Sequence, residues 1–309
     1  MRVVFMGTPE FAVPSLEGLA SAFEVCAVVS QPDRPRGRGL KLRPTPVKAR
    51  ALDLGLQVLQ PLRVREAGFL EELSALAPDV ILVAAYSRLL PPAILELPRL
   101  GCVNLHPSLL PRYRGAIPIQ AALINGDSQT GLTTFLMDEG YDTGDLLMQV
   151  SVPIDPEETG QELSTRLARE GARVLVETVR GLQAGNLVRR PQPSGGDYTR
   201  PLRKEDLLLD WGLPASRVRD FLRALAHEPA ALTFWRDHPV KLGRAEVRPD
   251  LQGPPGTVLH LEKGKGPVVA TGQGAVLLRE LKPAGKGWMD GWAFVQGRDL
   301  RPEERFGSD

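Results

Sequence analysis

The sequence lacks several features that mark large classes of protein. Its two cysteines, Cys26 and Cys102, stand far apart in apolar runs, which excludes a disulfide framework and a CxxC motif. No uncharged apolar stretch approaches the roughly 18 residues that a membrane helix needs, and the first residues enter a strand pattern directly, without a signal-peptide layout. We therefore expect a cytoplasmic protein that has no membrane partner.

An excess of charge is also missing. The chain carries 38 Lys+Arg and 37 Asp+Glu, a formal net charge of +1. This balance excludes a protein that coats nucleic acid indiscriminately through its overall charge, although it is compatible with a local basic patch. The 309 residues, 42% of them apolar, are enough for one large domain or two medium domains with real cores.

Short apolar runs alternate with helical patterns through the first two thirds of the chain. Such alternation is typical of βαβ units, so it predicts an α/β fold with an open, mostly parallel, Rossmann-like sheet and helices on both faces. The expected strands are Arg2–Met6, Val25–Ser30, Val80–Tyr86, Cys102–Leu105, Gly131–Met137 and Leu146–Pro153, and the expected helices are Pro14–Ser21, Thr45–Leu54, Gly68–Ala77 and Thr159–Ala184.

Residues 189–205 interrupt this rhythm, because they are rich in Pro and Gly and show no apolar period. We interpret them as a linker between a first domain, 1–188, and a second domain, 206–309. The second domain shows closely spaced short strands with Gly/Pro turns, which predicts a small OB-like β-barrel. Its expected elements are a helix, Ala215–Ala226, and the strands Leu232–Trp235, Pro239–Leu242, Gly256–Leu261, Pro267–Ala270 and Ala275–Leu281.

Two polar residues stand where the fourth apolar run ends. Asn104 and His106 lie on the same side of this strand because side chains alternate. Ligands of open parallel sheets bind beyond the carboxyl ends of the strands, so this position favours a functional site over a buried structural histidine. The other histidines all lie in the second domain, and no Walker, G-x-S-x-G or G-x-G-x-x-G motif is present, so neither a metal site nor a dinucleotide site is indicated.

A carboxylate would complete such a site. The polar turn between the last two expected strands of the first domain holds four acids, Asp138, Glu139, Asp142 and Asp145, which are equally eligible from the residues alone. An Asn/His/carboxylate set suits acyl transfer to an amine, since amide and imidazole N–H groups can stabilise the oxyanion. We expect the carboxylate to raise the pKa of the histidine and to help remove the proton of the amine.

A third signal is the basic segment Arg34–Arg50, which contains no acid. The prolines and glycines in its first half predict a flexible loop rather than a helix. The segment is either a solvated surface loop or a clamp for a polyanion; the mutual repulsion of its charges favours an anionic partner. Its basic residues are Arg34, Arg36, Arg38, Lys41, Arg43, Lys48 and Arg50.

Four stretches together resemble the folate-dependent formyltransferases: Val4–Ala12, Gln31–Lys48, Asn104–Gly115 and Met137–Asp145. The last two stretches are typical of these enzymes in general. The basic loop resembles the branch that acts on methionyl-tRNA, and the resemblance spans the whole chain.

The resemblance implies transfer of a formyl group from 10-formyltetrahydrofolate, as cosubstrate, to the α-amine of methionyl-initiator tRNA, giving N-formylmethionyl-tRNA for translation initiation. It selects Asp142 from the acidic turn, so that Asn104, His106 and Asp142 form the catalytic trio. It implies no metal, a formyltransferase catalytic domain over 1–188 and a tRNA-binding OB-like domain over 206–309. The implied folate-binding residues are Ser108, Leu109, Leu110, Pro111 and the backbone of Arg88, Leu89 and Leu90; the implied tRNA-binding residues are Arg34, Arg36, Arg38, Lys41 and Arg43.

Two alternatives remain open at this point. One is a formyltransferase that acts on an amino-sugar nucleotide, since such an enzyme can share the trio; a two-phosphate substrate would not need so many cations. The other is an inactive RNA-binding module, against which the intact trio argues. We expect a monomer, because nothing in the sequence demands a larger assembly.

Overall fold

The computed structural model describes residues 1–36 and 41–307. The chain divides into two compact units. The first unit comprises Met1–Pro118, Gln129–Pro153 and Ser164–Thr199, and the second comprises Ile119–Ser128, Ile154–Leu163 and Arg200–Asp309. The division therefore differs from a single cut at residues 189–205, because two short stretches of the expected first domain belong to the second unit.

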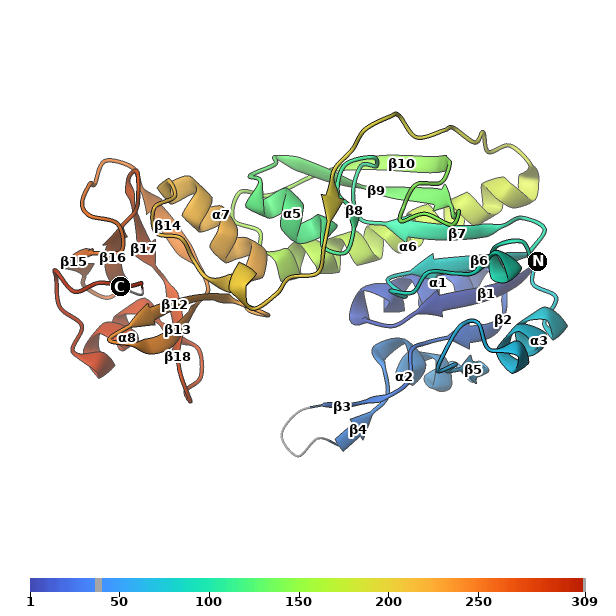
Figure 1. Cartoon of the computed structure of the whole chain (residues 1–309), viewed down its shortest axis with the longest axis horizontal. Helices are drawn as coiled ribbons and strands as arrows, with labels where there is room; N and C mark the ends of the chain where they lie inside the picture. The colour runs from blue at the N-terminus through green and yellow to red at the C-terminus, as the bar shows by residue number, and fades with distance from the viewer. Residues whose placement is uncertain (37–40, 308–309) are drawn as a thin grey trace. The chain divides into compact units, whose positions relative to one another are not determined.

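The first unit is built on a seven-stranded sheet with the order β10-β9-β7-β6-β1-β2-β5 (Figure 1). The five strands from β7 to β5 are parallel, β9 runs antiparallel to β7, and β10 runs antiparallel to β9, so the prediction of a mostly parallel sheet is confirmed. The strands are β1 (Arg2–Gly7), β2 (Glu24–Val29), β5 (Val58–Leu59), β6 (Val80–Ala84), β7 (Cys102–His106), β9 (Gln129–Leu136) and β10 (Leu146–Pro153).

The strand order reverses at β1. The chain places β2 and β5 on one side of β1 and then returns to place β6 and β7 on the other side. In open α/β sheets, ligands usually bind beyond the carboxyl ends of the strands at such a reversal, here those of β1 and β6. The segments that follow β6 and β7 both begin at this edge.

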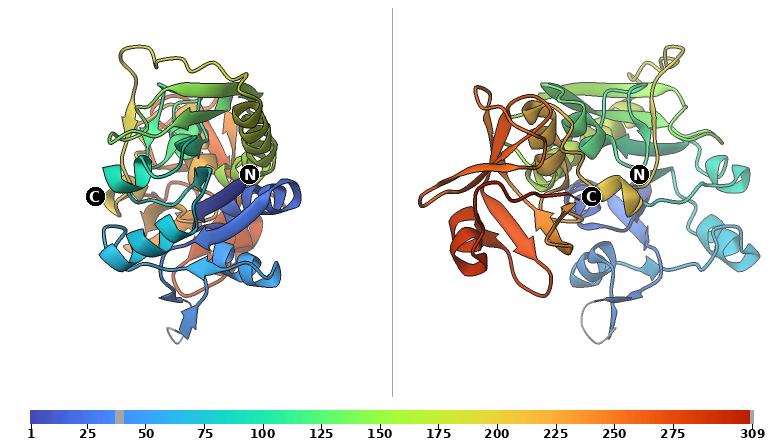
Figure 2. Two further views of the ribbon diagram at one scale, coloured as in Figure 1. Left: turned by 90° about the vertical axis from the view of Figure 1, so that its right-hand side faces the viewer. Right: turned by 60° about the vertical axis from the view of Figure 1, so that its left-hand side comes forward.

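Helices cover both faces of this sheet (Figure 2). One face packs against α3 (Ala67–Ala75) and α4 (Pro92–Leu95), whose Phe69 and Ile94 share a buried cluster with Met6 and Cys102. On the other face, Gly171 packs so closely against Leu105 that a Cβ added to this glycine would lie 2.7 Å from Leu105 Cδ2. Asn104 and His106 alternate with Leu105 and so face the side of α3 and α4. The remaining helices of this unit are α1 (Val13–Ala22), α2 (Pro46–Asp53) and α6 (Gly160–Ala184), the last counted with it from Ser164.

The first half of the basic segment is an antiparallel β-ribbon rather than the loop that we expected. Strand β3 (Arg34–Arg36) pairs with β4 (Lys41–Arg43), which places Arg34 opposite Arg43. We call these two strands the basic ribbon; Figure 1 shows it extending beyond α2. Strands of three residues with Pro and several Arg have no apolar period, so the sequence pattern could not reveal them. Arg38 lies outside the described residues.

The expected linker is bound to the first unit over much of its length. Arg190 bridges Leu146 at the start of β10. Further on, β11 (Tyr198–Thr199) pairs in parallel with β8 (Arg114–Gly115). The backbone of this segment therefore contributes hydrogen bonds to the first unit instead of running free between two domains.

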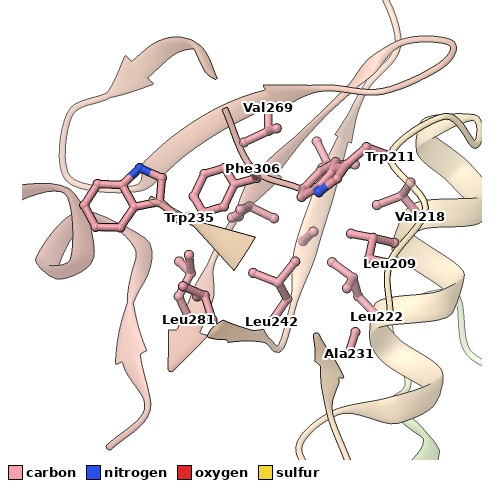
Figure 3. Close-up of a cluster of buried hydrophobic side chains, with 14 of the residues drawn as sticks. Leu209, Trp211, Val218, Leu222, Ala231, Trp235, Leu242, Val269, Leu281 and Phe306 are labelled. Atoms are coloured by element: carbon pink, nitrogen blue, oxygen red, sulfur yellow. The ribbon is translucent and has the colours of Figure 1, made fainter. Parts of the chain in front are cut away.

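The second unit contains two four-stranded antiparallel sheets, β12-β13-β18-β19 and β14-β17-β16-β15. The terminal segment bridges an edge of each, through Phe306 to Trp235 and Arg305 to Thr257. Side chains of both sheets and α7 fill a common core that contains Trp211, Trp235 and Phe306 (Figure 3). Its elements are α5 (Pro118–Ile124), α7 (Ala215–Leu225), β12 (Ala231–Trp235), β13 (His238–Leu242), β14 (Ala245–Arg248), β15 (Val258–Glu262), β16 (Gly266–Ala270), β17 (Ala275–Leu278), β18 (Glu280–Pro283), β19 (Met289–Asp290) and α8 (Gly291–Arg298).

In the described part of the chain, no helix is both long and apolar enough to span a membrane.

Candidate functional site

The structure brings Asn104, His106 and Asp142 together at the end of β7. Asn104 Nδ2 donates to Asp142 Oδ1 over 3.4 Å, and His106 Nδ1 lies 3.5 Å from Asp142 Oδ2. The His106 side chain is 5% exposed and that of Asp142 17%. Asp142 itself comes from the loop between β9 and β10, 38 residues along the chain from Asn104.

The backbone and its amide donors distinguish Asp142 from the other acids of its turn. Asp142 has a positive φ of 55°, and its Oδ2 accepts a 2.7 Å hydrogen bond from the backbone N–H of Gly115. Asp138 instead accepts from Gly140 N and Thr143 Oγ1, within its own turn. Residue types could not separate these acids, because only the contact with a distant segment does so.

The ring of His106 is fixed from both sides. Its Nε2 lies 2.9 Å from the carbonyl oxygen of Tyr113. Because a carbonyl only accepts, Nε2 carries the hydrogen, and in the neutral ring the lone pair is on Nδ1, which faces Asp142. The site therefore offers a proton acceptor whose protonated form would be held by a carboxylate.

Burial lowers the pKa of His106 below its ordinary value of 6.5, and it outweighs the Asp142 carboxylate and the Tyr113 carbonyl, which both raise it. Our expectation of a raised histidine pKa was thus wrong in direction. The carboxylate acts as expected, but removal of the charged ring from water has the larger effect. The resting imidazole is therefore held in its neutral form.

Asn104 adds an amide N–H donor to the arrangement. Its 3.4 Å contact with Asp142 is at the long end for a hydrogen bond, so this amide N–H can turn to a ligand oxygen at little cost. Asn104 is only partly buried, whereas His106 is almost fully enclosed. Together the trio combines a hydrogen-bond donor, a neutral base and an anion.

The loop that follows His106 is anchored to the antiparallel strands. Thr133 Oγ1 donates to the Ser108 carbonyl over 2.6 Å, and Gln149 Nε2 donates to the Leu110 carbonyl over 2.8 Å. The side chains of Ser108 and Leu110 are buried, while those of Leu109 and Pro111 are partly exposed. A ligand beside this loop would thus meet its backbone and the latter two side chains.

The loop that follows β6 lies at the strand reversal. Ala85 and Ser87 have positive φ values of 48° and 59°, a conformation that side chains disfavour and that persists where the surroundings fix it. Leu90 is buried in the core and Leu89 is 38% exposed. Arg88 is fixed by a 2.7 Å hydrogen bond from Nη1 to the Leu62 carbonyl. The backbone of Arg88–Leu90 remains the part of this loop that suits a ligand.

The basic segment divides into exposed and paired cations. Arg34 and Arg43 of the basic ribbon are exposed. Two other cations find acids outside the segment: Lys48 Nζ lies 2.7 Å from Asp33 Oδ2, and Arg50 Nε lies 2.7 Å from Glu17 Oε1. The repulsion that we inferred from the sequence is therefore relieved in the α2 part, whereas in the ribbon Arg34 stands opposite Arg43.

Sequence reasoning missed two residues behind Asp142. Gln192 Nε2 donates to the carbonyls of Asp142 and Gly144, and Arg114 donates to Gln192 Oε1. Gln192 stands between two prolines in a stretch without a pattern, and only this isolation could have drawn attention to it. Among the residues described, no group of three or more His, Cys, Asp or Glu side chains is arranged to hold a metal ion.

Comparison with known proteins gives consistent results. The family described as "Formyl transferase" matches residues 1–179, and "Formyl transferase, C-terminal domain" matches residues 201–299. Relatives named methionyl-tRNA formyltransferase are 46% identical in Synechococcus sp. (strain JA-3-3Ab), over 99% of this chain and 98% of the relative, and 46% identical in Symbiobacterium thermophilum, over 99% and 95%.

A solved structure has the same fold. HypX from Aquifex aeolicus, in complex with tetrahydrofolic acid, superposes with a TM-score of 0.64 at 19% identity. The match covers 96% of this chain and 47% of HypX, so the chain spans about half the length of that protein.

Proposed function

The chain belongs to the methionyl-tRNA formyltransferases of the formyl transferase family, and we propose that it transfers the formyl group of 10-formyltetrahydrofolate to the α-amine of methionyl-initiator tRNA. The product is N-formylmethionyl-tRNA for translation initiation. The observation that carries this proposal is the convergence of Asn104, His106 and Asp142 at the end of β7, in a chain with full-length relatives of that name.

The trio suits each part of this reaction. An α-amine has a pKa of about 7.7–8.0, so a useful fraction is neutral and nucleophilic near pH 7. When the amine attacks the formyl carbon, the Asn104 amide donates to the developing oxyanion. The neutral His106 ring accepts the proton of the amine at Nδ1, and Asp142 stabilises the imidazolium that forms. The bond from the formyl carbon to the folate nitrogen then breaks, and that nitrogen takes up a proton.

Two loops support the choice of folate as the donor. Both Arg88–Leu90 and Ser108–Pro111 follow parallel strands at the edge where the strand order reverses. The first has a strained backbone next to it and the second is pinned by Thr133 and Gln149. Rigid loops with available backbone groups suit a flat heterocycle that carries many hydrogen-bonding atoms. The 10-formyl form supplies the group to be transferred.

The basic ribbon supports tRNA as the acceptor. Arg34 and Arg43 are exposed cations on a projecting element, which is suited to phosphates of a nucleic-acid backbone. We infer the same role for Arg36, Arg38 and Lys41, and a tRNA-binding role for the second unit. The relatives named above are tRNA enzymes by name, so an amino-sugar nucleotide is not favoured as acceptor. We further propose that the enzyme acts as a monomer in the cytoplasm.

The test is an assay of the purified protein with 10-formyltetrahydrofolate and three acceptors: charged initiator Met-tRNA, charged elongator Met-tRNA and an amino-sugar nucleotide. We expect N-formylmethionine on the initiator tRNA and no transfer to the sugar. Transfer to the sugar nucleotide alone would support the alternative, and no transfer to any acceptor would overturn the proposal.

A further inference from the structure

One side-chain amide holds the turn that presents Asp142. Gln192 Nε2 donates to the Asp142 carbonyl over 2.9 Å and to the Gly144 carbonyl over 2.8 Å. The two hydrogens of one amide group thus tie both ends of a three-residue stretch. Asp142 in this stretch has a positive φ of 55°, a left-handed conformation that Asp tolerates better than most side chains.

A buried guanidinium holds Gln192 in turn. Arg114 Nη2 and Nε donate to Gln192 Oε1 over 2.7 Å and 3.1 Å. Its Nη1 donates to the Gly195 carbonyl over 3.2 Å and to the Tyr198 hydroxyl over 3.3 Å. This fork gives the amide of Gln192 one orientation, with Oε1 toward Arg114 and Nε2 toward the carbonyls of the turn.

The same segment reaches the other side of Asp142 through the backbone. Gly115, which follows Arg114 in β8, donates its N–H to Asp142 Oδ2 over 2.7 Å. Strand β11 pairs with β8, and the Arg114 N–H donates to the Asp197 carbonyl over 2.8 Å. One framework, built from β8 and residues 192–199, therefore holds both the carboxylate and the main chain of Asp142.

The buried Arg114 donates its hydrogen bonds to neutral groups. This residue is only 8% exposed, and the partners described above are neutral oxygens of an amide, a carbonyl and a phenol. Burial of a guanidinium is costly, and an arrangement without a compensating carboxylate is retained more readily for a site than for stability.

We propose that Arg114 and Gln192 are positioning residues for the formyl transfer, which fix Asp142 against His106 through the carbonyls of residues 142 and 144. The inference rests on the function proposed above. It also gives the inter-domain segment a second task, because the stretch that leads into Arg200 and the second unit holds the catalytic carboxylate. Neither residue touches the reacting atoms, so their effect is on the rate of the bound complex.

The kinetic test uses Gln192→Ala and Gln192→Glu, with Gln183→Ala as the matched control. Gln183 is exposed on α6, so Gln183→Ala removes the same side-chain amide from an exposed surface position. The Glu variant keeps an acceptor for Arg114 but replaces two donors by a carboxylate that faces two carbonyls. Since misplacement of a catalytic group by about 1 Å can cost on the order of 10² in rate, we expect kcat to fall roughly tenfold to a hundredfold in both variants. The KM values of both substrates and the melting temperature of Gln192→Glu stay close to those of the wild type.

Two results would overturn the inference. One is a Gln192→Glu enzyme with wild-type kcat, since the amide hydrogens would then be dispensable. The other is a loss that appears only in the KM values or only in thermal stability, which is what a purely structural residue gives. Arg114→Lys, which keeps the charge but loses the fork, is expected to share the kcat loss; wild-type kcat in this variant would remove Arg114 from the proposal.

A second readout separates this inference from the proposed function. The chain has four histidines, so ¹⁵N-histidine labelling gives four pairs of ring-nitrogen signals, and His106→Gln identifies the pair that belongs to His106. We expect the ring shifts of His106 to move in Gln192→Ala and to stay in Gln183→Ala. An inactive wild type with this shift would refute the function and retain the positioning role, whereas an active wild type with unmoved His106 shifts would refute the positioning role alone.

Discussion

The proposed catalytic trio and the basic ribbon use polar residues in opposite ways. The His106 and Asp142 side chains are 5% and 17% exposed, and each is oriented by a backbone group: the Tyr113 carbonyl, seven residues further on, for His106, and the N–H of the distant Gly115 for Asp142. Arg34 and Arg43 are exposed on two short strands. The trio thus has its geometry before a ligand arrives, whereas the ribbon offers charge with little fixed direction.

The difference separates the interactions that accelerate the chemical step from those that bind the substrate. Preorganised groups in a water-poor site stabilise charge that develops in the transition state, so they determine kcat. Exposed cations attract phosphates of any sequence and release counterions, so they determine binding and its salt dependence. The basic segment contains both kinds of cation. Arg34 and Arg43 are exposed, whereas Lys48 and Arg50 are already paired with acids of the first unit.

The largest effect is expected from the trio. Asn104→Ala should lower kcat by roughly 10²–10³, the usual effect of removing one oxyanion donor. Steady-state kinetics with saturating formyl donor and tRNA measures it. Turnover near the wild-type value would remove Asn104 from the chemistry and weaken the contrast with the ribbon.

The next effect concerns the ribbon. Arg34→Ala combined with Arg43→Ala should weaken tRNA binding and lower the slope of log K against log salt by between about 1.4 and 1.8, because two phosphate contacts are lost. Binding measured from low to moderate salt gives this slope. Arg173→Ala with Arg180→Ala, two exposed positions on α6, is the control that should keep the wild-type slope. An equal slope in ribbon variant and wild type would refute the clamp.

A smaller effect follows from the lowered pKa of His106. Its folded-state pKa lies below the ordinary 6.5 because of burial, so the unfolded chain binds this proton more readily. The stability contribution is present above pH 6.5 and is lost as the pH falls below it. Urea unfolding at pH 7.5 and 5.5 should show a smaller acid-induced loss in His106→Gln than in the wild type. The other three histidines are common to both proteins. The same loss in both would show that His106 does not titrate in this way.

The smallest effect tests the paired cation. Lys48 is bonded to Asp33 and lowers the pKa of that carboxyl through this hydrogen bond. Lys48→Gln should therefore leave the salt slope of tRNA binding unchanged and lower the free energy of unfolding by at most about 1 kcal/mol. A slope that falls as far as in a ribbon variant would mean that the pair opens and that Lys48 belongs to the clamp.

The trio was only partly predictable from sequence. Asn104 and His106 could be identified because they are polar residues at the end of a buried parallel strand. Asp142 could not be separated from its neighbours without the resemblance, since the Gly115 N–H and the Gln192 amide that select it come from elsewhere in the chain. The direction in which the pKa of His106 shifts could not be predicted either, because a sequence shows a charge nearby but not the depth of burial.

The same contrast holds for the fold. The parallel strands were predicted because each is a run of apolar residues long enough to stand out. The basic ribbon, β14 and α8 were missed: the strands have three or four residues with Arg, and α8 contains two glycines, so neither shows a clear period. Their structure depends on pairing with neighbouring segments.

The central claim, that the trio performs the chemistry and the ribbon only gathers the substrate, is tested most directly by single-turnover formyl transfer to initiator Met-tRNA at increasing enzyme concentration. The variant Arg34→Ala/Arg43→Ala should need more enzyme but reach the wild-type rate at saturation. Asn104→Ala should saturate at the wild-type concentration and remain slow. A ribbon variant that stays slow at saturation, or an Asn104→Ala enzyme that recovers there, would contradict this division of roles.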